Sequence, residues 1–167
     1  VVEVTKSLAQ YFRLALNQGH EQITLKDEID HVRQYLFIQK QRYGDKLQYE
    51  IEEDESIADY KLPKLVLQPL VENAIYHGIK EIDRQGMIRV TSAAEEGQLI
   101  LSIYDNGRGF ELRDSTDMTL PRLGGVGLKN VDQRLRLQFG DDYHMEIQSE
   151  PDKFTRISLY LPLVTDD

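Results

Sequence analysis

The strongest constraint on the fold is a pair of segments, residues 87–94 and 98–105, in which apolar and polar side chains alternate. Alternation with a period of two indicates β-strands with one buried face, and the intervening Glu95-Glu96-Gly97 is typical of a hairpin turn. One face of the second strand would carry Leu99, Leu101 and Ile103, and the other Ile100, Ser102 and Tyr104. The chain must therefore fold around a sheet that other elements cover on one side.

Helices are predicted where apolar side chains recur every three or four residues. This spacing occurs before Asn17, over 25–43, from about Gln68 and over 127–139. Thr24 precedes the second helix in a capping-box pattern, whereas Pro69 predicts a kink or a new helix start close to Gln68. The apolar seam of 25–43 suits packing against another helix as well as packing on its own domain, and both interpretations stay open.

Further strands are predicted at 47–53, 143–149 and 154–161, and the segment from Asn106 to Gly125 has little periodicity. Irregular segments longer than ~15 residues are commonly lids or binding loops. The order is two helices, then β, α, ββ, lid, α, ββ. This order indicates an α+β fold in which helices are layered on one sheet.

Composition narrows the possible functions. A length of 167 residues fits one domain with a short appended element, and the absence of cysteine excludes disulfides and thiolate metal sites. The net charge of −9 argues against a general nucleic-acid surface. No run reaches the ~20 apolar residues that span a bilayer, and we expect a chain that opens at Val1 to be a piece of a longer protein.

The most informative motif is Asp105-Asn106-Gly107-Arg108-Gly109, which begins where the second predicted strand ends. Asp, Asn and Gly are common in ordinary turns, so a plain strand end is one interpretation. The functional interpretation places Asp105 at the rim of a pocket, where its carboxylate accepts a hydrogen bond from an exocyclic amine. Gly107 and Gly109 would then let a ligand approach the backbone.

A second motif, Gly124-Gly125-Val126-Gly127-Leu128, stands at the start of the predicted helix 127–139. Glycines at a helix N-terminus leave backbone N–H groups free to bind phosphate, and the helix dipole favours the negative charge. A flexible loop with an ordinary cap is the alternative interpretation. The spacing is neither that of a P-loop nor that of a dinucleotide-binding fingerprint.

A third motif is Glu72-Asn73, followed by Tyr76-His77-Gly78. Asn73 and His77 are four residues apart, so we expect them on one helix face. The side-chain oxygens of Asn73 and Glu72 are of the ligand type that Mg²⁺ prefers. His77 suits a contact with a ligand as well as the capping of carbonyl groups at a helix end.

Taken in chain order, these motifs resemble the GHKL ATPases, a superfamily of histidine kinases, type II topoisomerases, mismatch-repair ATPases and a large heat-shock chaperone. The string Leu-Gln-Pro-Leu-Val-Glu-Asn-Ala-Ile-Tyr-His-Gly at 67–78 is similar to the N-box of LytS/YesM-type sensor histidine kinases. Residues 125–131 are similar to the glycine motif of that group, and 25–45 to its linker helix. The resemblance covers nearly the whole chain.

The resemblance implies a two-layer α/β sandwich with a mixed sheet. It also implies a division into a helical segment, residues 1–45, at the end of dimerisation or linker helices, and an ATP-binding catalytic domain, residues 46–167. The implied activity is transfer of the ATP γ-phosphoryl group to a histidine outside this chain. The expected partners are ATP with Mg²⁺, the phospho-acceptor helices of the same protein and a response regulator, in a cytoplasmic domain of a membrane-bound homodimer.

Residue by residue, the resemblance implies that Asp105 binds the adenine amine and that Asn73 holds Mg²⁺. Gly107 and Gly109 would shape the adenine pocket, and His77 would lie near the nucleotide. The residues expected to meet the phosphates as a lid closes are Gly125, Val126, Gly127 and Leu128.

Three departures from the family pattern matter. Members of the superfamily that hydrolyse ATP carry glutamate four residues before the metal-binding asparagine, where this chain has Pro69. Proline cannot polarise water, so phosphoryl transfer is favoured over hydrolysis, with Glu72 left as a residue that could in principle assist. Tyr76 stands where the family often has lysine. None of the four histidines is followed by proline, as the family's acceptor is, so we expect the acceptor outside this chain.

Two alternatives remain at this stage. One is a conformational ATPase of the same superfamily, which Pro69 disfavours. The other is a non-catalytic nucleotide-binding or dimerisation module that uses the seam of 25–43. Brisk ATP turnover would support the first, and dimerisation without nucleotide binding would support the second.

Overall fold

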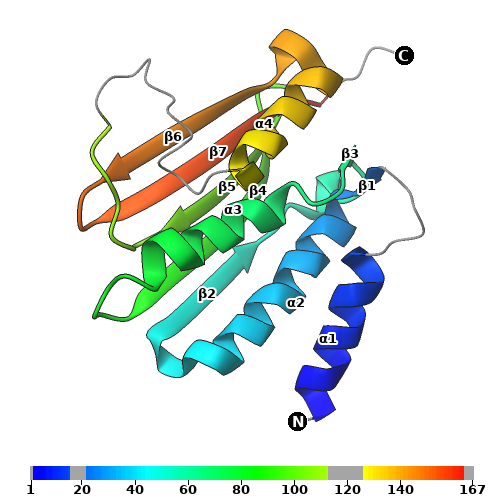
Figure 1. Ribbon diagram of the computed structural model, residues 1–167. Helices are drawn as coiled ribbons and strands as arrows, with labels where there is room; N and C mark the ends of the chain where they lie inside the picture. Colours follow the sequence, from blue (N-terminus) through cyan, green and yellow to red (C-terminus); the bar gives the residue numbers. More distant parts are fainter. Residues whose placement is uncertain (1, 16–21, 113–125, 164–167) are drawn as a thin grey trace.

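The computed structural model describes residues 2–15, 22–112 and 126–163, which form a layer of helices on a sheet (Figure 1). The helices are α1 (Val2–Ala15), α2 (Leu25–Tyr43), α3 (Leu67–Asn73), a π-helix that directly continues it (Ala74–Ile79), and α4 (Val126–Phe139). The strands are β1 (Gln22–Thr24), β2 (Leu47–Glu52), β3 (Lys61–Pro63), β4 (Gly86–Glu95), β5 (Gln98–Asp105), β6 (His144–Glu150) and β7 (Phe154–Pro162). Short 3₁₀ turns occur at Gly44–Lys46, Glu55–Ile57 and Gly140–Asp142.

The central sheet has the strand order β2-β4-β5-β7-β6. β2 runs parallel to β4, and the other neighbours are antiparallel, so the predicted α+β fold with a mixed sheet is confirmed. Glu96 and Gly97 join β4 to β5 with positive φ angles of 50° and 79°, which is the geometry of a two-residue hairpin turn. Leu99, Leu101 and Ile103 face the helices and are buried, as the alternation predicts.

The seam on α2 packs on its own domain. Leu25, Ile29, Val32 and Leu36 are buried in the same hydrophobic core as the inner face of the sheet. The helix begins where predicted, because the Thr24 side chain accepts a hydrogen bond from the Asp27 N–H at 3.1 Å. α1 lies alongside α2 (Figure 1), and the division of the chain at residue 45 stays a prediction.

Pro69 marks a new helix start rather than a kink. α3 begins at Leu67, which places Pro69 in the first turn, where a missing N–H costs no helical hydrogen bond. Two features were not predicted: the π-helix Ala74–Ile79 and the small antiparallel sheet of β1 and β3. In the described parts of the chain, no helix has the length and apolar character needed to cross a membrane.

Candidate functional site

Asp105 ends β5 and is buried, with 3% of its surface exposed. One carboxylate oxygen, Oδ1, accepts a hydrogen bond from the Gly107 N–H at 2.9 Å. Burial raises the pKa of Asp105 to about 7, although the Gly107 hydrogen bond acts in the opposite direction. Burial makes the charged form of this carboxyl costly. A hydrogen bond donated by a ligand would stabilise that charged form.

Glycines let the backbone close around this carboxylate. A methyl group at Gly78 would collide with the Asp105 side chain, and one at Gly107 would collide with the Gly78 backbone. Gly109 has a φ of 56°, and a methyl group there would run into the Glu150 carbonyl oxygen. The structure therefore brings the sequence motif at 105–109 against the π-helix and against the β6–β7 turn.

A narrow cavity of about 30 Å³ lies between these elements. Of the predicted site residues, Asn73, His77, Asp105 and Gly109 line it. The other lining residues are Gly78, Arg108, Phe110 and Thr155. Asn73 and Asp105 thus face one cavity although they lie on a helix and a strand that are far apart in the sequence.

Asn73 is the last residue of α3 and is buried, with 8% of its surface exposed. Its side-chain oxygen, Oδ1, has no hydrogen-bond partner among the described residues. A buried acceptor without a partner is uncommon and calls for an explanation, such as an ion or a ligand. One free amide oxygen fits Mg²⁺, which keeps several waters and takes its other ligands from phosphates.

The side chains near Asn73 show whether the protein could supply further ligands to a metal ion. Glu72 Oε1 already accepts a hydrogen bond from Gln68 Nε2 at 2.8 Å. In the described ranges no group of three His, Cys, Asp or Glu side chains could hold a metal ion. These residues therefore fit a Mg²⁺ ion that arrives with the nucleotide better than a resident metal held by the protein alone.

His77 is exposed and lies on the π-helix, where it lines the same cavity as Asn73. The π-helix begins directly after Asn73, so the two residues do not share a regular α-helical face as predicted from their spacing. π-helical turns are rare and frequently occur at functional sites. Here the turn also brings Gly78 over Asp105.

The second glycine motif is described from Val126 onward, and Gly125 lies outside the described residues. Val126 begins α4, Gly127 is exposed beside Pro69 of α3, and Leu128 points into the core. Because the Leu128 side chain is buried, this residue offers only its backbone groups to a ligand. The N-terminus of α4 thus adjoins the helix that carries Asn73.

Two residues of this region were missed by the sequence reasoning. Thr155 of β7 pairs with Asp105 across the sheet, is buried and lines the cavity. Arg84 donates hydrogen bonds to the carbonyl oxygens of Asn106 and Gly107, at 2.5 and 3.2 Å, and so holds the loop after β5. Strand register and a contact over some twenty residues of sequence carry no local signal, which is why neither residue was found.

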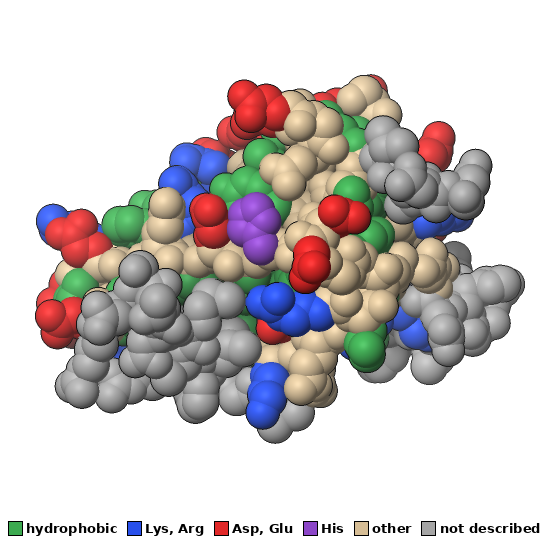
Figure 2. Space-filling view, turned by 90° about the horizontal axis from the view of Figure 1, so that it is seen from above, with side chains coloured by type: hydrophobic (Ala, Val, Ile, Leu, Met, Phe, Trp, Pro, Cys, Tyr) green, Lys and Arg blue, Asp and Glu red, His purple; other side chains and the backbone are tan. Residues whose placement is uncertain are grey.

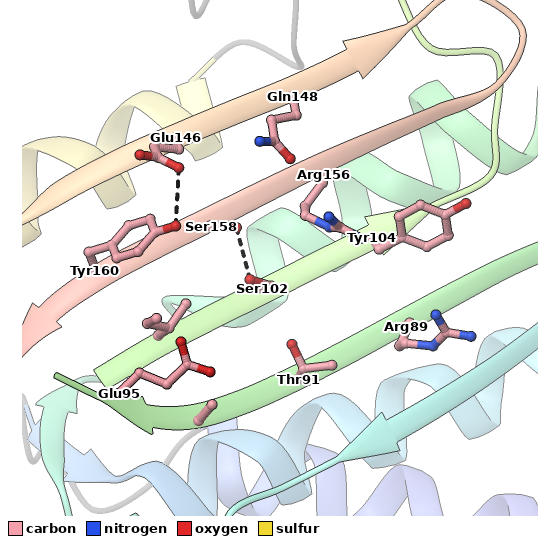
Figure 3. A pocket seen from close by; sticks show the side chains of 12 residues that line it. Arg89, Thr91, Glu95, Ser102, Tyr104, Glu146, Gln148, Arg156, Ser158 and Tyr160 are labelled. Atoms are coloured by element: carbon pink, nitrogen blue, oxygen red, sulfur yellow. Dashed lines mark hydrogen bonds between the residues drawn. The ribbon is translucent and has the colours of Figure 1, made fainter. Parts of the chain in front are cut away.

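A larger groove of about 370 Å³ lies on the opposite face of the sheet, between side chains of β4 to β7 (Figure 3). Tyr104 lies there between Arg89 and Arg156, and Tyr160 donates a hydrogen bond to Glu146 at 3.1 Å. None of the residues of the three sequence motifs lines this groove. Polar side chains on the solvated face of such a sheet are ordinary.

Charge is dispersed over the surface. On the face in Figure 2, acidic and basic side chains are interspersed with hydrophobic ones. With a net charge of −9, attraction of an anionic ligand has to come from local groups. Among the described residues that line the cavity, Arg108 supplies a positive charge.

Asp105 at a strand end and Asn73 on a helix thus line one cavity, which is the arrangement expected from the resemblance to the GHKL ATPases. In agreement, residues 58–165 match the family of histidine kinase-, DNA gyrase B- and HSP90-like ATPases, and residues 1–47 match the histidine kinase family. The chain therefore belongs to the histidine kinase-, DNA gyrase B- and HSP90-like ATPases. The predicted relationship to LytS/YesM-type sensor histidine kinases is confirmed by the relatives that follow.

The sensor histidine kinase BtsS of Escherichia coli is 38% identical over 160 residues, which are 96% of this chain and 27% of that protein. The sensor histidine kinase YesM of Bacillus subtilis is 32% identical over 164 residues, 97% of this chain and 28% of that protein. This chain spans about a quarter of the length of these relatives.

Solved structures agree on the fold. A histidine kinase domain of a blue-light-activated kinase from Erythrobacter litoralis superposes with a TM-score of 0.63 at 17% identity, over 96% of this chain and 78% of that one. The histidine kinase AdeS of Acinetobacter baumannii gives a TM-score of 0.63 at 16% identity, over 96% and 77% of the two chains.

Proposed function

We propose that this chain binds Mg²⁺–ATP and transfers the γ-phosphoryl group to a histidine outside it, as the catalytic domain of a sensor histidine kinase. The observation that supports this most is the shared cavity, where buried Asp105 and the unpartnered oxygen of Asn73 face one space. Asp105 would accept a hydrogen bond from the adenine amine. The cavity is narrow, so adenine binding requires a small opening between Asp105 and Phe110.

At the phosphate end, Asn73 Oδ1 is the protein oxygen for Mg²⁺, and the first turn of α4 offers backbone N–H groups to the phosphates. When bound, Mg²⁺ neutralises charge on the phosphate oxygens. Phosphoryl transfer depends mainly on such positioning and charge neutralisation rather than on covalent chemistry by the protein. Gly125, Val126, Gly127 and Leu128 are proposed as this phosphate contact, and Gly107 and Gly109 as the walls of the adenine pocket.

The acceptor is proposed to lie on a helix outside this chain. Among the described histidines, His31 is buried in α2 with 1% of its surface exposed, and His144 stacks on Tyr160 with ring centroids 4.3 Å apart. His77 lines the nucleotide cavity itself. His31 is therefore inaccessible, His144 lies on a strand, and His77 lies at the proposed nucleotide site rather than on a separate acceptor helix.

The wider setting is also a proposal: a cytoplasmic domain of a homodimeric membrane protein that passes its phosphoryl group to a response regulator. The division into a helical segment, residues 1–45, and a catalytic domain, residues 46–167, belongs to the same proposal. It is supported by the separate family matches at 1–47 and 58–165.

The proposal is tested by titrating a non-hydrolysable ATP analogue with and without Mg²⁺, followed by transfer from labelled ATP to an added helix that bears the upstream histidine. We expect magnesium-dependent binding and label on the histidine. Brisk hydrolysis without transfer would instead support a conformational ATPase, and failure to bind nucleotide would support a non-catalytic module.

A further inference from the structure

A buried carboxylate on α2 caps the beginning of α3. Glu28 is fully buried, and its two carboxylate oxygens accept hydrogen bonds from three successive backbone N–H groups. These are the N–H groups of Leu65, Val66 and Leu67, at 3.0, 2.6 and 2.9 Å. N–H groups at the start of a helix lack helical partners, and Val66, at the cap position, supplies no side-chain hydrogen bond. Glu28 therefore supplies the cap of α3 from a neighbouring helix.

Arg134 of α4 holds the same turn from its carbonyl side. Its Nη2 donates to the Lys64 carbonyl oxygen at 2.5 Å and its Nη1 to the Leu65 carbonyl oxygen at 3.4 Å. Leu65, between these contacts, has a φ of 60°, an unfavourable left-handed conformation for a residue with a side chain. Such a conformation persists only where the surrounding structure fixes it. The turn 64–67 is thus fixed jointly by α2 and α4.

The charges on the two sides of the turn support each other. Burial raises the pKa of the Glu28 carboxyl, whereas the three backbone N–H groups and the positive charge of Arg134 act to lower it. A buried carboxylate that keeps three N–H donors in place is costly to replace, because each donor would lose its partner. The turn therefore responds to changes in either Glu28 or Arg134.

α3, which follows this turn, and α4, which contacts the turn through Arg134, both lead to the phosphate end of the proposed site. α3 runs from Leu67 to Asn73 in two turns, and Gly127 in the first turn of α4 lies beside Pro69 of α3. The adenine end is held differently, because Asp105 belongs to β5 and is fixed by sheet pairing with β4 and β7. A shift of the turn would move Asn73 relative to Asp105.

We propose that Glu28 and Arg134 are positioning residues that set the start of α3, and through it the distance of the Asn73 oxygen from nucleotide-bound Mg²⁺. This inference rests on the proposed function. Glu28 and Arg134 contact neither nucleotide nor metal in this role.

The test compares E28Q with D30N, which makes the same carboxylate-to-amide change on the same helix. Asp30 forms only partly exposed ion pairs with Lys26 and Arg33. For each protein the affinity of a non-hydrolysable ATP analogue is measured by calorimetry with and without Mg²⁺. Residues that orient a metal ligand typically change metal affinity by about ten- to a hundred-fold. Glu28 acts on the metal ligand only through the position of α3. We therefore expect the gain in nucleotide affinity caused by Mg²⁺ to be roughly ten-fold smaller in E28Q.

The metal-free affinity of E28Q, which reports the adenine end, should match that of the wild type, and D30N should behave as the wild type throughout. Equal losses with and without Mg²⁺ would show a merely structural role and overturn the inference, as would an unchanged magnesium gain in folded E28Q. If E28Q does not fold, R134K carries the same comparison, because lysine keeps the charge but cannot bridge both carbonyls. Absence of nucleotide binding by the wild type would instead overturn the proposed function itself.

Discussion

The two ends of the cavity are built in different ways. The adenine end is closed by the sheet and by glycines: Asp105 is fixed between two strands, and Gly78 and Gly107 pack the backbone against its carboxylate. The phosphate end instead has an unused hydrogen-bond acceptor, because the Asn73 side-chain oxygen has no partner within the described structure. In the proposed site, the base would therefore meet a preformed surface, whereas the phosphates would depend on a cation bound at Asn73.

The largest expected effect is at the adenine end. Asp105→Ala removes the only carboxylate among the described residues that line the cavity, and a hydrogen bond to a charged group contributes about 1.5–3 kcal/mol. The affinity for an ATP analogue should therefore fall by roughly ten-fold to over a hundred-fold, with and without Mg²⁺. Calorimetric titration checks this, and an unchanged dissociation constant would remove Asp105 from base recognition.

Nucleotide affinity should also depend on pH, because of Asp105 at the adenine end. The folded-state pKa of Asp105, raised by burial to about 7, lies above its ordinary value of 3.8. Below pH 3.8, Asp105 makes its full contribution to the free energy of unfolding of the unliganded protein. This contribution is lost as the pH rises through about 7. Nucleotide binding needs the carboxylate, so affinity should rise about ten-fold from pH 6 to pH 8.

The control for this pH dependence is Asp105→Asn, which keeps the shape of the side chain and cannot ionise. Any titration of the nucleotide phosphates remains in that variant and can be subtracted. A wild-type profile as flat as that of the variant would show that Asp105 is ionised throughout, and would contradict the burial argument.

A change at the phosphate end should affect only the magnesium-dependent part of nucleotide binding. Asn73→Ala removes the unpartnered oxygen at the cavity, so the affinity gained from Mg²⁺ should fall by roughly ten-fold or more while metal-free binding persists. Titrations at several magnesium concentrations measure this. Binding that stays equally sensitive to magnesium would mean that another group holds the cation.

The smallest effect is expected for Thr155→Val. The Thr155 hydroxyl shares a hydrogen bond with Ser149 Oγ at 2.9 Å and lines the cavity beside Asp105. Loss of one neutral hydrogen bond within the protein costs about 0.5–1.5 kcal/mol of folding stability, so thermal unfolding should shift to lower temperature without a change in the magnesium dependence of binding. A selective loss of the magnesium effect would place Thr155 at the wrong end of the site.

The sequence predicted the regions with strong local patterns. Alternation defined β4 and β5, helical spacing defined α2 and α4, and Pro69 in the first turn marked the start of α3. The motif at 105–109 predicted the carboxylate that lines the cavity, because an aspartate at a strand end followed by glycines is a local pattern. The predictions for Gly125 and the rest of the lid concern residues outside the described ranges and remain predictions.

The parts that were not predicted depend on contacts between distant segments. Thr155 reaches Asp105 only through strand register, and Glu28 reaches the α3 N-terminus across 37 residues or more. The π-helix begins at Ala74, directly after Asn73, and no proline or glycine at that position signals the change in helix type. Its tight approach of Gly78 to Asp105 is a tertiary contact, which local propensity does not encode.

The most direct test of the account is a crystal structure of this chain with Mg²⁺ and a non-hydrolysable ATP analogue. The account predicts the adenine amine within hydrogen-bond distance of the Asp105 carboxylate, and Mg²⁺ bound by Asn73 Oδ1 and phosphate oxygens. A structure with the base away from Asp105, or with the cation held by other side chains, would contradict it.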